Sequence, residues 1–137
     1  MYKPFNKKLH ETYDERARTA TKNYVKKQGH EAIDNPDKYG ADLIVEGLCY
    51  LECEIKRYWD KDYYPYYYIR LPYRKKKFAN LEMPTLFYIW NNKCSAAVRI
   101  QGSKLHTAEV KEYKNSQMPK GELFFWFVAK EHRLVHI

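Results

Sequence analysis

Two short segments that alternate apolar and polar residues around Gly47 constrain the fold more than any other feature. Residues 41–46 read Ala-Asp-Leu-Ile-Val-Glu, and residues 50–57 read Tyr-Leu-Glu-Cys-Glu-Ile-Lys-Arg. Side chains alternate between the two faces of a strand, so the aliphatic residues of each segment share one face. The pattern therefore predicts an antiparallel hairpin with one apolar face, and such a face must be covered by another layer.

A helix that could supply this layer is expected at residues 10–28, before the hairpin and a short strand that precedes it. Acidic residues lie early in this range and basic residues late, which suits the helix dipole, and Gly29 is a natural stop. Apolar and small residues recur near and within the range at helical spacing: Leu9, Tyr13, Ala17, Ala20 and Tyr24.

The rest of the chain predicts mainly strands. A basic loop is expected at residues 72–77, and no clear periodicity supports a second helix after Lys56 or near residues 78–81. The expected strands are residues 30–33, 63–71, 85–90, 96–101, 107–113, 123–128 and 132–137, with residues 85–101 forming a hairpin. The 137 residues thus predict a single α+β domain spanning 1–137, a mixed sheet with an N-terminal helix packed on it.

The polar face of the first hairpin carries the candidate chemistry. A three-residue loop at residues 47–49 would place Asp42 across from Glu54, with Lys56 one step beyond. Facing carboxylates repel each other and favour a cation between them. With waters and the Ile55 backbone carbonyl they would form an oxygen site for Mg²⁺, or Mn²⁺ as a substitute, while Lys56 would assist at a bound phosphate.

An Asp followed about a dozen residues later by Glu-x-Lys on the adjacent strand resembles the PD-(D/E)xK nuclease superfamily. That superfamily includes restriction endonucleases, Holliday-junction resolvases and many phage nucleases. The matching residues are Asp42, Glu54 and Lys56, and the family's order of helix, strand, Asp-bearing strand and Glu-x-Lys strand covers residues 8–58. The resemblance implies a restriction-endonuclease-like core and a Mg²⁺-dependent endonuclease that uses these three residues to hydrolyse DNA.

Two further acids are candidates for the same site. Glu52 precedes Glu54 by two residues on the same face, where it could be another ligand, a supporting group or a surface acid. Many members of the superfamily also carry an acid on the first helix that points at the metal. Of the acids there, helical geometry favours Asp14, while Glu11 and Glu15 lie nearly opposite the apolar stripe. The alternative is that these acids only compensate the helix dipole.

The charge balance favours an anionic partner. Lys and Arg number 25 against 17 Asp and Glu, which gives a net charge of +8 and points to DNA. Residues expected to hold its phosphates are Arg70, Arg74, Lys75, Lys76 and Lys77. The alternative for this segment is a solubilising loop. The tyrosines of residues 63–68 could stack on unpaired bases or pack in the core.

Other classes of function lack support in the sequence. Three cysteines are too few for a disulfide framework, and no apolar run is long enough for a membrane span. No signal peptide is expected, so the interior of the cell is the predicted location, with a phage origin suggested by analogy. A homodimer would allow both DNA strands to be cut. The alternatives are a non-catalytic nucleic-acid-binding or virion-associated protein, and an assembly protein that binds an acidic partner.

Overall fold

The structure is a computed structural model that describes residues 7–115 and 118–137. Within these residues the chain forms one α-helix, α1 (Lys7–Lys27), and two sheets joined by short 3₁₀ helices. The strands are β1 (Ile33–Asp34), β2 (Leu43–Val45), β3 (Cys49–Ile55), β4 (Tyr68–Pro72), β5 (Thr85–Trp90), β6 (Ala96–Gln101), β7 (Glu109–Asn115), β8 (Met118–Val128) and β9 (Arg133–His136). The 3₁₀ helices are η1 (Tyr73–Ala79), η2 (Gly102–His106) and η3 (Ala129–Glu131).

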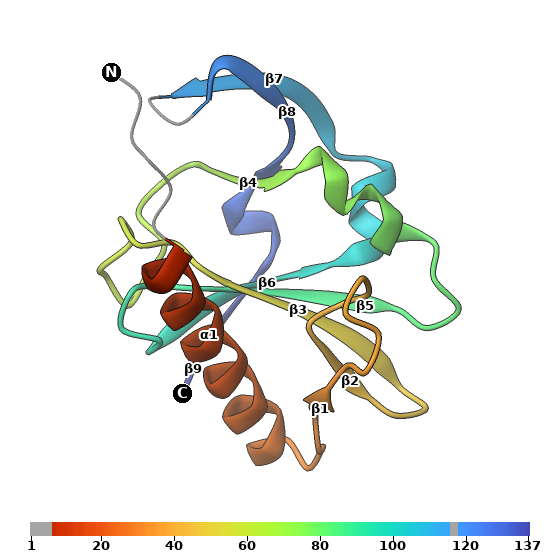
Figure 1. Cartoon of the computed structure of the whole chain (residues 1–137). Helices are drawn as coiled ribbons and strands as arrows, with labels where there is room; N and C mark the ends of the chain where they lie inside the picture. The colour runs from red at the N-terminus through yellow and green to blue at the C-terminus, as the bar shows by residue number, and fades with distance from the viewer. Residues whose placement is uncertain (1–6, 116–117) are drawn as a thin grey trace.

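The elements form three layers, with α1 on one face of a six-stranded sheet and a three-stranded sheet on the other (Figure 1). The six-stranded sheet has the order β1-β2-β3-β5-β6-β9, and the three-stranded sheet has the order β4-β8-β7. The pair β3–β5 is parallel and its neighbours are antiparallel. This arrangement confirms the predicted α+β class, with the N-terminal helix packed on a mixed sheet.

The helix packs as its sequence spacing predicts. Ala17 and Tyr24 are buried against the sheet, and the hydroxyl of buried Thr21 accepts a hydrogen bond of 2.9 Å from the Trp90 indole. Gly29 follows the helix with φ of +90°, a conformation that glycine adopts without steric cost. The same core holds Leu43, Val45, Cys49 and Leu51, which are the aliphatic face predicted for the first hairpin.

A second core fills the space between the two sheets. Strands β5 and β6 contribute one face each, and the three-stranded sheet and the 3₁₀ helices cover it. Its main residues are Trp59, Ile69, Leu71, Phe78, Phe87, Ile89, Val98, Ile100, Leu105, Phe125 and Phe127. The acidic face of β3 therefore looks toward this second layer and away from α1.

Several predicted boundaries differ from the structure. The hairpin of residues 85–101 is confirmed, but the strand predicted over residues 63–71 begins only at Tyr68. The predicted loop of residues 72–77 is the 3₁₀ helix η1. Strand β8 starts well before the predicted Leu123, because Gly121 takes a φ of +80° and lets the strand continue through a tight approach to Glu112. Nowhere in residues 7–115 and 118–137 is there a helix of the length and apolar character that a membrane crossing requires.

Candidate functional site

The register of the β2–β3 hairpin decides which acids meet. Val45 pairs with Cys49 and Leu43 pairs with Leu51, so the turn comprises residues 46–48 and Asp42 stands opposite Glu52. The prediction of a loop at residues 47–49 is therefore wrong. It would pair Asp42 with Glu54, two residues further along β3 than the observed partner Glu52. The cause is that Cys49 is buried in the helix-side core and belongs to the strand, while Gly47 occupies the middle of the turn with φ of +73°.

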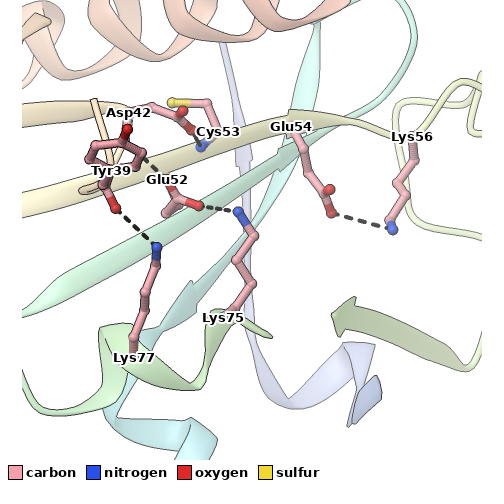
Figure 2. Close-up of polar contacts among 8 residues, drawn as sticks. All are labelled: Tyr39, Asp42, Glu52, Cys53, Glu54, Lys56, Lys75 and Lys77. Atoms are coloured by element: carbon pink, nitrogen blue, oxygen red, sulfur yellow. Dashed lines mark hydrogen bonds and ion pairs between the residues drawn. The ribbon is translucent and has the colours of Figure 1, made fainter. Parts of the chain in front are cut away.

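Backbone hydrogen bonds hold the carboxylates of Asp42 and Glu52 (Figure 2). The Asp42 backbone N–H donates to Glu52 Oε2 at 2.9 Å, and the Cys53 N–H donates to Asp42 Oδ2 at 2.9 Å. Both carboxylates are thus held by backbone groups of the opposite strand, which fixes their orientation. A shift of two residues preserves the alternation of faces, so the prediction that acids gather on the face opposite the aliphatic residues still holds.

Glu52 is the most strongly perturbed acid of this group. The residue is 5% exposed, and burial raises the pKa of its carboxyl to about 7, with a further contribution from the negative charge of Asp42. The ammonium of Lys75 acts in the opposite direction. A carboxylate in this position is destabilised in its charged form unless cations lie nearby, so the site attracts positive charge.

The nearest cation comes from the 3₁₀ helix that follows β4. Lys75 Nζ forms an ion pair with Glu52 Oε1, and Figure 2 shows this side chain reaching from η1 toward β3. Lys77, two residues further, donates from Nζ to the Tyr39 carbonyl at 2.9 Å. Lys75 was predicted to lie along a phosphate backbone, but its ammonium already contacts the acid pair.

Glu54 and Lys56 form a second charged pair further along the same strand. Their side chains are 3.3 Å apart, and Lys56 Nζ also lies 3.4 Å from the Arg70 carbonyl of β4. Glu54 Oε1 is buried and accepts no hydrogen bond from the described residues. The predicted Glu-x-Lys residues thus contact each other, while Asp42 contacts Glu52.

The carboxylates of Asp42 and Glu52 offer hard oxygen donors to a divalent cation. Two carboxylates with phosphate and water oxygens suit Mg²⁺, which takes few protein ligands. In the described part of the chain no three His, Cys, Asp or Glu side chains are grouped closely enough to hold a metal ion. Asp14, half-buried in α1, therefore does not complete a three-acid site. The Ile55 carbonyl was predicted as a ligand beside Glu54. Because the register pairs Asp42 with Glu52, this carbonyl belongs to the residue three positions after the acid that faces Asp42.

The other residues predicted to bind DNA differ in their surroundings. Arg74, Lys76 and Lys77 are exposed on η1, with Lys76 Nζ donating to the Tyr73 hydroxyl and Lys77 Nζ to the Tyr39 carbonyl. Arg70 is half-buried, and its guanidinium lies 3.6 Å from the ring centre of Tyr113. The sequence interpretation placed Trp126 in a strand buried on both faces and gave neither it nor Tyr113 a binding role, since nothing in their local pattern shows that they meet Arg70.

The sequence interpretation included Glu52 as a further candidate but did not predict that it pairs with Asp42. The signal available was Gly47, because a glycine at the middle of a three-residue turn sets the pairing that brings Glu52 to Asp42.

Comparisons of the chain with protein-family models, with curated proteins and with solved structures find no significant match.

Proposed function

We propose that this chain is a Mg²⁺-dependent nuclease that hydrolyses phosphodiester bonds of DNA at the Asp42–Glu52 pair. The observation that carries the proposal is this pair of facing carboxylates, braced by backbone hydrogen bonds, with the Lys75 ammonium in contact. The order α1, β1, β2, β3 is the order typical of the PD-(D/E)xK superfamily, and a restriction-endonuclease-like core is part of the proposal.

In this proposal Asp42 and Glu52 hold the metal ion, and Glu54 is the next acid along β3. The ion, when bound, would polarise the phosphate and lower the pKa of a bound water. Lys75 and Lys56 place ammonium groups beside the acids, where they can stabilise negative charge that develops on the phosphate oxygens. The partial burial of the site strengthens these interactions relative to bulk water.

The departure from the family pattern concerns the lysine. With Glu52 as the strand acid, the residue two positions later is Glu54, so the motif reads Glu-x-Glu. We therefore assign the role of the motif's lysine to Lys75, which comes from η1 and contacts Glu52. Lys56 pairs with Glu54 instead.

Cleavage of supercoiled plasmid in Mg²⁺ and in Mn²⁺ tests the proposal. The wild type should nick or linearise the plasmid with either ion and not in EDTA. Asp42→Asn and Glu52→Gln should each reduce the rate roughly 100-fold or more, because they remove charge and keep hydrogen-bond acceptors. Glu46→Gln, in the exposed turn of the same hairpin, is the matched control and should cut normally.

The same assay separates the two assignments of the acid. If Glu54→Gln and Lys56→Met abolish cleavage while Glu52→Gln does not, the pair at the end of β3 is the site, and the assignment to Glu52 is wrong. If Asp42→Asn cuts at the wild-type rate, the site itself is wrong. Branched, single-stranded and duplex substrates should be compared, with paired nicks in duplex DNA as the sign of a homodimer.

A second candidate function is nucleic-acid binding without hydrolysis, as in a virion-associated protein. The observation that favours it is the Lys75–Glu52 ion pair, which neutralises the acid without a metal. In that case the protein should bind DNA in a salt-dependent manner and should leave every substrate intact in both metals.

A further inference from the structure

The outward face of the three-stranded sheet carries a set of aromatic rings and cations that the proposed site does not use. On strand β8, Phe125 and Phe127 point into the core, so alternation places Trp126 on the opposite face. Strand pairing brings Arg70 of β4 opposite Trp126, and the same alternation brings β7 residues to the same face. We call this set the aromatic face; it consists of Tyr68, Arg70, Lys111, Tyr113 and Trp126.

Rings and cations alternate across the aromatic face at contact distance. The Arg70 guanidinium lies 3.6 Å from the Tyr113 ring centre and 5.1 Å from that of Trp126. Lys111 Nζ lies 4.8 Å from the Trp126 ring centre and 5.4 Å from that of Tyr68. These contacts hold the rings in place, since cation–π attraction and strand pairing act together, and they leave a preformed surface rather than a set of mobile side chains.

Tyr68 is exposed on this face, and Tyr113 and Trp126 are half-buried. Tyr68 is 39% exposed and its neighbour Tyr67 is 59% exposed, and their ring centres lie 4.7 Å apart. Tyr68 in turn lies 5.3 Å from Trp126. The core between the sheets is filled by the opposite face of the same sheet. On the outer face Phe124 is buried beside the Tyr113 ring, while Tyr68 is exposed and Trp126 is partly exposed.

We infer that the aromatic face binds single-stranded DNA, with unpaired bases stacked on its rings and phosphates held by Arg70 and Lys111. Rings stack on bases only where the bases are unpaired, since the π faces of duplex bases are already covered by their neighbours. Glu109, next to Lys111 on the same strand, pairs with it at 3.5 Å, and a phosphate would compete for that lysine. The chain's net charge of +8 favours the polyanion.

The aromatic face adjoins the proposed site through β4. Lys56 Nζ, which pairs with Glu54, lies 3.4 Å from the backbone carbonyl of Arg70, and η1 follows β4 directly and carries Lys75 to Glu52. The inference deepens the proposed nuclease function and rests on it for the choice of DNA. The expected substrate is a DNA that has a single-stranded segment next to the scissile bond.

Fluorescence anisotropy with a labelled oligo-dT, in EDTA so that nothing is cut, tests the face. The wild type should bind oligo-dT more tightly than a duplex of equal length. Trp126→Ala should weaken oligo-dT binding roughly 5- to 150-fold, Trp126→Phe should restore most of it, and Arg70→Gln should reduce its salt dependence. Circular dichroism and thermal melting should confirm that each variant is folded.

Tyr13→Ala is the matched control, because this ring also lies beside two arginines, Arg16 and Arg57, but belongs to α1. Binding that is unchanged in folded Trp126→Ala and Tyr68→Ala variants would overturn the inference, as would tighter binding of oligo-U than oligo-dT. If Trp126→Ala binds poorly but the wild type cuts nothing, the face stands and the nuclease proposal fails. If Trp126→Ala still binds oligo-dT and cuts plasmid, the nuclease proposal stands and the face fails.

Discussion

The free energy of unfolding should fall as the pH rises through neutrality, and Glu52 should be the cause. Burial and the charge of Asp42 raise the pKa of its carboxyl to about 7 from an ordinary value of 4.5. Between these two values the folded chain holds a proton that the unfolded chain has released. The neutral carboxyl therefore stabilises the fold at low pH, and this stabilisation is lost as the pH rises from the unfolded value through the folded one.

The size of the effect follows from the two pKa values. A difference of this kind corresponds to at most about 3 kcal/mol between about pH 4 and pH 8. The Lys75 ammonium lowers this pKa, and the value of about 7 already includes that effect. We expect a loss of about 3 kcal/mol over this range.

Glu52→Gln isolates this contribution, because the amide does not titrate and still offers an oxygen to the Asp42 N–H. Urea unfolding should be measured for both proteins from about pH 5 to about pH 8. Subtracting the two free energies of unfolding cancels the groups that titrate alike in both proteins. As the pH rises, the variant should gain stability relative to the wild type. Glu46→Gln, in the exposed turn, should show a constant difference. A constant difference for Glu52→Gln as well would refute the argument.

Three further results are expected. Lys75→Met removes the cation that lowers the pKa of Glu52, so the fall in stability should move to higher pH in the same urea series; an unmoved fall would contradict the ion pair. Mg²⁺ added above pH 7 should raise the stability of the wild type by about 2.7 kcal/mol at a hundred times its Kd, seen as a higher Tm; an equal rise in Asp42→Asn would place the ion elsewhere. Gly47→Ala should lose about 1–2 kcal/mol because φ is +73° there, and urea unfolding equal to the wild type would contradict the turn described.

Local patterns predicted the elements whose signals lie within one turn or one strand. The helix was found from the spacing of Ala17 and Tyr24 and from Gly29, and the β5–β6 hairpin was found from its two apolar runs. Alternation alone also separated the acidic face of β3 from its aliphatic face. These properties depend only on neighbours a few residues away, so the sequence carries them in full.

Register and sheet pairing are properties of the whole fold, and the sequence carries them only in part. Whether Cys49 belongs to the turn or to the strand depends on the space beneath α1, which no local pattern displays. Arg70 meets Trp126 only because β4 pairs with β8, across more than fifty residues of chain. The strand predicted from Tyr63 began five residues late for a similar reason, since the tyrosines before Tyr68 pack on one another and not in a ladder.

The two-residue error in register shows what a spacing motif can and cannot define. Because the error was even, every acid stayed on its predicted face, and only the partner of Asp42 changed. The ammonium group changed with it, from Lys56 on the same strand to Lys75 on η1. Electrostatic stabilisation of a phosphate depends on where the charge lies in space and not on which element supplies it. A motif read along one strand can therefore predict the face on which the acids gather and still not show that the Lys75 ammonium contacts Glu52.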